Sequence, residues 1–213
     1  MESSITFSIT AIVLAAFIQF GIQPRLHVLT RKLMASAILT CPLLFHAFTN
    51  GDFNKIGINF SNPGLTLLIS LFFSTVAIWV NYHFAWNPEN IKLYPQVRTR
   101  IWTIRLVILN ILSWCVYILI YEFVFRGYLF FESIDHYGFT LAIFFNVIIY
   151  SVAHIPKSLR EAILSMPLAV LLCLITWYTG NIWSSVFIHL TLALSNEYFA
   201  FRANPNLSFQ RTF

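Results

Sequence analysis

The chain has 213 residues, of which 58% are hydrophobic and only 10% are charged, with a formal net charge of +5. A soluble domain carries about 25% charged residues, so this composition excludes an ordinary soluble protein and predicts an integral membrane protein. The basic residues lie in short clusters between apolar runs, which is typical of membrane topology signals. We therefore expect contact with a lipid bilayer and none with nucleic acid.

Long apolar runs without alternation predict an all-α, polytopic membrane helix bundle with about seven transmembrane segments. The segments are Ser4–Ile22, Leu33–Thr49, Leu65–Trp86, Leu106–Phe131, Phe139–His154, Met166–Thr179 and Ile182–Phe199. The second and sixth are short for a span of about 20 residues, so six spans plus one re-entrant segment are the alternative. Residues 1–213 form a single membrane domain in either case, with no internal repeat.

The connections between these segments carry basic residues on alternate sides. The predicted cytoplasmic residues are Arg25, Arg31, Lys32, Lys92, Arg98, Arg100, Arg105, Lys157, Arg160, Arg202 and Arg211. The opposite connections hold only Lys55. This asymmetry predicts an outside N-terminus and a cytoplasmic C-terminus in a bacterial inner (plasma) membrane. The first segment lacks a basic start, so we interpret it as an uncleaved anchor.

Glu122 and Arg126 interrupt the fourth apolar segment. On a helix they share a face at the favourable i, i+4 order, and a charge inside the membrane costs a few kcal/mol unless it is paired. Intramembrane charges usually face a bundle interior and mark a functional site. A structural ion pair that ties helices together is the alternative interpretation.

Two histidines lie on later segments. Asn146, Tyr150 and His154 recur every four residues and predict a polar stripe on an otherwise apolar helix, while Ser185 and His189 share a face of the last helix. With a turn near residues 132–137, the axial rise of about 1.5 Å per residue brings Glu122, His154 and His189 to similar depths. We expect these three side chains to converge on a water-filled chamber.

Three short motifs lie in order within residues 111–196. Glu122 and Arg126 form Glu-x-x-x-Arg, His154 ends an aromatic-x-x-x-His motif with tyrosine at its first position, and His189 begins the last motif. In this arrangement the segment resembles the catalytic core of the CPBP intramembrane proteases, also called the CAAX-protease or Abi family. The resemblance implies a glutamic-type endopeptidase, without a cofactor, that cleaves a membrane-associated peptide or protein.

Two positions depart from the family pattern. Tyr121 occupies the position of the family's first glutamate, which is thought to activate water with the first histidine. Ala193 occupies the position of the last asparagine, which is thought to assist the last histidine at the oxyanion. Asn196 lies on the same face as His189 but about two turns away, so we expect it to be a poor substitute.

The residues and the resemblance lead to three hypotheses. In the first, Glu122 and His154 deprotonate water, His189 donates to the oxyanion, and Arg126, Tyr121, Tyr150 and Asn196 support the site. In the second, the chain is a catalytically impaired relative that acts as a membrane scaffold or peptide-binding protein. In the third, Glu122, His154 and His189 bind zinc, although the chain has no HExxH motif. The sequence does not determine the oligomeric state.

The remaining polar residues receive structural interpretations. His46, Asn81 and His83 lie at or near predicted span ends, where polar side chains are ordinary. Lys157, Arg160 and Glu161 are interpreted as a cytoplasmic interfacial turn.

Overall fold

The structure is a computed structural model that describes residues 2–21, 27–49 and 52–211. Its elements are α1 (Glu2–Ala16), the π-helix η1 (Phe17–Gly21), α2 (Val28–Thr49), α3 (Pro63–Phe84), α4 (Pro88–Leu93), β1 (Ile101–Thr103), α5 (Ile104–Glu122), the π-helix η2 (Phe123–Leu129), α6 (Phe130–Tyr137), α7 (Phe139–His154), α8 (Leu159–Thr179), α9 (Trp183–Ala203) and β2 (Ser208–Gln210). The predicted all-α bundle is confirmed. Ile22 and Arg25, which belonged to the predicted first segment and first basic cluster, lie outside the described residues.

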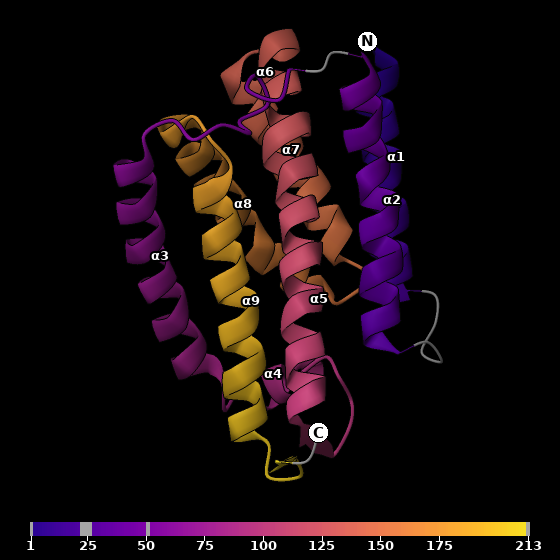
Figure 1. The fold of residues 1–213 in the computed structure, drawn as a ribbon, viewed down its shortest axis with the longest axis vertical. Coiled ribbons are helices and arrows are strands. Elements are labelled where there is room, and N and C mark those ends of the chain that lie inside the picture. The colour runs from indigo at the N-terminus through magenta and orange to yellow at the C-terminus, as the bar shows by residue number, and fades with distance from the viewer. Residues whose placement is uncertain (1, 22–26, 50–51, 212–213) are drawn as a thin grey trace.

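The long helices pack in pairs along one common direction (Figure 1). Helix α3 packs on α9, α7 on α8, and α2 on both α1 and α5. The beginning of α1 and the end of the described chain lie at opposite ends of the bundle (Figure 1), an arrangement that an odd number of crossings would produce. The orientation of these ends relative to a membrane stays a prediction.

In the described part of the chain, four helical stretches are long and apolar enough to cross a membrane, namely Val28–Thr49, Pro63–Phe84, Ile104–Tyr137 and Leu159–Thr179. Two further apolar helical stretches, Phe7–Gln19 and Phe139–His154, are shorter. Helix α3 exposes leucine and phenylalanine side chains along its length, as a lipid-facing helix does. The chain is therefore an integral membrane protein, while the number of seven spans stays a prediction.

The second and sixth segments are longer than the sequence analysis predicted. Helix α2 has 22 residues and α8 has 21. Both helices begin several residues before the predicted apolar segments, so that their first turns include charged residues. Lys32 is buried in α2, where its ammonium donates to Asn110 Oδ1 at 3.3 Å and lies over the Trp114 ring. Ser158 caps α8 by accepting a hydrogen bond from Glu161 N.

The turn expected near residues 132–137 is absent, because the chain stays helical from Ile104 to Tyr137. Glu132 and Asp135 are compatible with a helix, and the break comes at Gly138, whose φ of 80° disfavours other residues. Within this long helix, η2 interrupts the α-helical hydrogen bonds directly after Glu122. Such π segments often lie at functional sites.

Gly127 lets the loop before α3 approach η2. A Cβ atom placed there would lie 2.9 Å from the carbonyl oxygen of Ile56. We expect Gly127→Ala to destabilise the protein by about 1–3 kcal/mol, because a backbone atom has little freedom to move away. The measurement is the thermal midpoint in detergent micelles. Gly64→Ala is the matched control, since no heavy atom lies within 4 Å of its added Cβ. Equal midpoints for both variants would contradict this prediction.

Candidate active site

Glu122 is fully buried where α5 passes into η2, and two partners hold its carboxylate. Its Oε1 accepts a hydrogen bond from His189 Nδ1 on α9 at 2.5 Å. Its Oε2 lies 3.4 Å from Arg126 Nε. The ion pair predicted from the i, i+4 spacing is thus present, and a histidine from a distant helix joins it.

The Arg126 guanidinium is fully buried in an aromatic environment. It lies over the rings of Tyr150 and Phe125, at 4.4 and 5.6 Å from their centroids. Cation–π attraction is strongest where water is excluded, as here. The cation stabilises the ionised form of the adjacent Glu122 carboxylate.

The two histidines have defined ring orientations. Since carboxylates and carbonyls only accept hydrogen bonds, Nδ1 carries hydrogen in both rings. His189 donates from Nδ1 to Glu122, and His154 donates from Nδ1 to the Tyr150 carbonyl oxygen at 2.7 Å. Nε2 of His189 lies 3.5 Å from the Tyr150 hydroxyl. In a neutral His154 ring, Nε2 is therefore available to accept a proton.

Tyr121 lies among these groups. Its ring stacks on Phe125 at 4.4 Å and meets the rings of Tyr150, His154 and His189 edge-on, at 5.7, 6.5 and 5.6 Å. Its buried hydroxyl has no hydrogen-bond partner among the described residues. The side chain is therefore positioned at the site without being held by a hydrogen bond.

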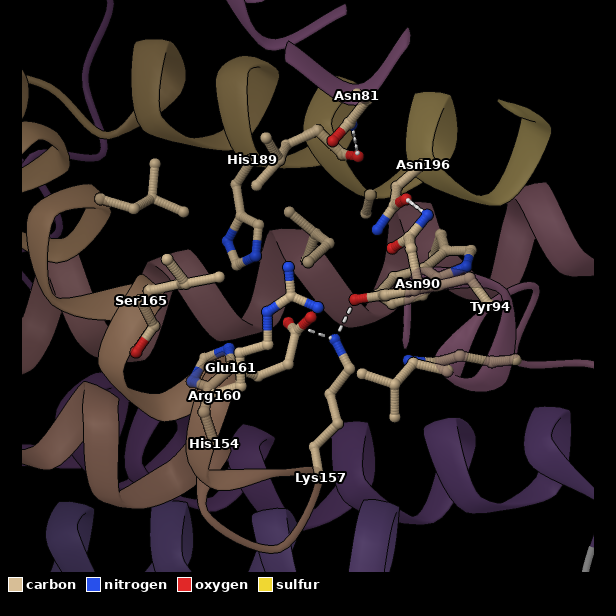
Figure 2. A pocket seen from close by; sticks show the side chains of 18 of the residues that line it. Asn81, Asn90, Tyr94, His154, Lys157, Arg160, Glu161, Ser165, His189 and Asn196 are labelled. Carbon is tan, nitrogen blue, oxygen red and sulfur yellow. Dashed lines mark hydrogen bonds and ion pairs between the residues drawn. The ribbon is translucent and has the colours of Figure 1, made fainter. Parts of the chain in front are cut away.

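A cavity of about 420 Å³ connects the two histidines with the connection between α7 and α8 (Figure 2). Tyr121, Tyr150, His154, His189 and Ala193 line its inner part. His154 and His189 both line this cavity, whereas Glu122 is not among its lining residues and lies behind His189. No hydrogen bond joins Glu122 to His154 within residues 2–21, 27–49 and 52–211, and the hydrogen-bond partner of Glu122 is His189.

Asn196 also lines the cavity, but its position agrees with the expectation of a poor substitute at 193. Its side-chain oxygen accepts a hydrogen bond from Asn90 Nδ2 at 3.0 Å. That contact ties α9 to α4. The Asn146 side chain supports the site differently, because its amide donates to the Phe125 carbonyl oxygen inside η2 at 2.7 Å.

Residues 93–195 match the family model described as type II CAAX prenyl endopeptidase Rce1-like. The matched segment contains all three motifs, from Glu122 to His189. This segment, just under half of the chain, is similar to the CPBP (CAAX protease) family. No curated protein and no solved structure gives a significant match. The two departures from the CPBP pattern, Tyr121 and Ala193, both face the cavity.

The three polar side chains of the CPBP core do not form a metal site in this arrangement. Among the described residues, no group of three or more His, Cys, Asp or Glu side chains is placed to hold a metal ion. One oxygen of Glu122 is bound by His189 itself, and the other lies beside Arg126. This geometry gives no support to the zinc-ligand hypothesis.

Sequence reasoning missed several residues that line the outer part of the CPBP cavity. They are Asn81, Asn90, Tyr94, Gln96, Lys157, Arg160 and Glu161. Asn81 bonds to α9 through Leu192 O and Ser195 Oγ, both at 2.7 Å. Asn81 lies three residues before the end of α3, a position typical of polar residues at the membrane interface. No periodicity in the sequence links it to α9.

Proposed function

We propose that this CPBP-like chain is an intramembrane endopeptidase that cleaves a membrane-associated peptide or a C-terminal anchor segment. The single observation that carries the proposal is that His189, held by Glu122, lines the same cavity of about 420 Å³ as a second, independently oriented histidine. Peptide hydrolysis needs a base for water and a donor for the developing oxyanion. Here two imidazoles supply these two functions.

His154 acts as the base in this proposal. Its Nε2 removes a proton from water, the water oxygen attacks the scissile carbonyl carbon, and the carbonyl electron pair moves onto oxygen. When the tetrahedral intermediate collapses, the C–N bond breaks and His154 returns the proton to the leaving amine. The Nδ1–H bond to the Tyr150 carbonyl keeps the ring fixed throughout.

His189 stabilises the oxyanion as an imidazolium. In this role both ring nitrogens carry hydrogen: Nδ1–H donates to Glu122 Oε1 at 2.5 Å, and Nε2–H donates to the negative oxygen. Counting Glu122, Arg126 and protonated His189, the cluster has a net charge of +1, which complements the charge of the intermediate. Glu122 and Arg126 are thus positioning residues rather than reacting groups.

The experiment is cleavage of a quenched fluorogenic peptide by protein in proteoliposomes. One probe has the prenylated C-a-a-X form, and a second is a C-terminal apolar helix with a polar junction. We expect cleavage of at least one probe. Turnover that survives alanine substitution at His154 or His189 would contradict the proposal.

A catalytically impaired relative that binds peptides is the second candidate, and Tyr121 and Ala193 favour it. The Tyr121→Glu, Ala193→Asn double variant separates the two functions. If the parent already cleaves, the endopeptidase proposal holds; if only the double variant cleaves, the chain is a binding protein.

Under the endopeptidase proposal, the single variant Ala193→Asn should raise kcat by about tenfold or more, because it adds an oxyanion donor beside His189. The rate of peptide cleavage at saturating substrate measures this effect. Ala203→Asn, at the end of α9 and outside the cavity lining, is the control. An unchanged kcat in Ala193→Asn would show that residue 193 does not face the oxyanion.

A further inference from the structure

The outer part of the cavity is charged. Among the described residues, its lining includes Lys157, Arg160 and Glu161 in addition to the two histidines. The three residues belong to the connection before α8 and to its first turn. Backbone hydrogen bonds from Lys157 N and Ser158 N to the His154 carbonyl oxygen, at 3.0 and 3.2 Å, fix this connection next to the base.

Lys157 and Glu161 neutralise each other. The Lys157 ammonium donates to Glu161 Oε2 at 2.7 Å and to the Tyr94 hydroxyl. Burial disfavours the charged ammonium, but Tyr94 and Glu161 outweigh that effect and raise the pKa of Lys157 above its usual value. Lys157 is therefore a fixed cation whose charge already has a partner.

Arg160 differs from Lys157. Within the described part of the chain, its guanidinium forms no hydrogen bond or ion pair, and the residue is exposed. Figure 2 shows its side chain extended across the middle of the cavity view, between Glu161 and His189. With Lys157 balanced by Glu161, the outer cavity retains one net positive charge, and Arg160 carries it. Guanidinium is the side-chain group that best matches a carboxylate, through two parallel hydrogen bonds.

We propose that Arg160 binds a carboxylate of the substrate peptide and thereby determines which peptides enter the site. This inference rests on the proposed function only in taking the cavity as the peptide-binding site. Arg160 lies in the first turn of α8, directly after the connection that is hydrogen-bonded to the His154 carbonyl oxygen, so the carboxylate belongs to a part of the peptide on the α8 side of the scissile bond. Its source is the end of the peptide chain or an acidic side chain.

The alternative anion is a lipid phosphate, but the position of Arg160 favours the peptide. The guanidinium projects into the cavity that holds His154 and His189. A lipid headgroup bound there would obstruct the peptide.

The test uses three peptides of one sequence in phosphatidylcholine proteoliposomes. The first has a free C-terminal carboxylate, the second is amidated, and the third is amidated but has a glutamate near its end. For the free-carboxylate peptide, we expect Arg160→Gln to raise KM by about 10- to 100-fold with kcat nearly unchanged, as for loss of a charge-assisted hydrogen bond. Arg160→Lys should recover part of the affinity because it keeps the charge but not the planar fork.

The controls identify which carboxylate of the peptide binds and show whether the effect is specific to Arg160. Arg202→Gln removes an exposed cation near the end of α9 and should leave KM unchanged. The amidated peptide should have a high KM that does not depend on Arg160. A low KM for the third peptide would assign the carboxylate to an acidic side chain. Equal KM values for all three peptides in the parent would overturn the inference while leaving the endopeptidase proposal intact. An effect of Arg160→Gln that appears only with anionic lipid would also overturn it.

If no peptide is cleaved, the endopeptidase proposal fails and the inference about Arg160 is still testable. Fluorescence anisotropy of the labelled peptides with protein in nanodiscs then replaces turnover. The same order of affinities, and the same 10- to 100-fold loss in Arg160→Gln, is expected. Equal binding by parent and variant would overturn the inference.

Discussion

Glu122→Gln should reduce kcat for peptide cleavage by about 10²–10³-fold, the usual loss on removal of an oxyanion donor. A neutral amide does not stabilise the His189 imidazolium, so Nε2 loses the hydrogen that it would donate. The affinity for the peptide should change little, because Glu122 is fully buried behind His189. The measurement is kcat and KM with the fluorogenic peptide in proteoliposomes.

The same substitution should also destabilise the bundle. Arg126 is fully buried, and breaking a buried ion pair by removal of one partner costs about 3–5 kcal/mol. The Glu122→Gln, Arg126→Gln double variant removes both charges, so its thermal midpoint should recover towards the parent while its activity stays low. Glu132→Gln, on the same long helix but in α6, is the control for loss of an acidic residue. Recovery of activity along with stability in the double variant would show that Glu122 only holds the fold.

Much of this fold could be predicted from composition and local pattern. Long apolar runs specify lipid-exposed helices because backbone groups must bond within the segment when no water is present. The pairing of Glu122 with Arg126 follows from the i, i+4 spacing alone, and the stripe of Asn146, Tyr150 and His154 follows from the helical period. These features depend on neighbours along one helix.

The errors have a different origin, since they concern contacts between helices. Lys32, which precedes the apolar run, is part of α2 and contacts Asn110 and Trp114 on α5. Nothing in the sequence around Lys32 indicates this contact. The hydrogen bond between Glu122 and His189 likewise depends on how α9 packs beside α5. The turn expected near residues 132–137 does not form because nothing before Gly138 breaks the helix.

Under the endopeptidase proposal, the buried charges give a reason why the site can work without the family's first glutamate. In the family pattern, two adjacent acidic residues face one arginine. With Tyr121 at the first position, Arg126 has Glu122 as its ion-pair partner and lies over two aromatic rings, and His189 lies between Glu122 and the cavity. A tyrosine at this position therefore makes the site more positive. That change favours stabilisation of an oxyanion over removal of a proton by a carboxylate.

His154 then remains as the base, and His154→Gln should lower kcat by about 10²–10⁴-fold. Glutamine can keep a donor towards the Tyr150 carbonyl oxygen but cannot accept a proton, so KM should stay close to that of the parent. The rate of peptide cleavage as a function of substrate concentration separates the two effects. His83→Gln, on the exposed face of α3, removes an imidazole outside the cavity lining and should leave both constants unchanged. If His154→Gln cleaves at the parental rate, the proton of water is removed by another group, and the Glu122–His189 pair is the remaining candidate.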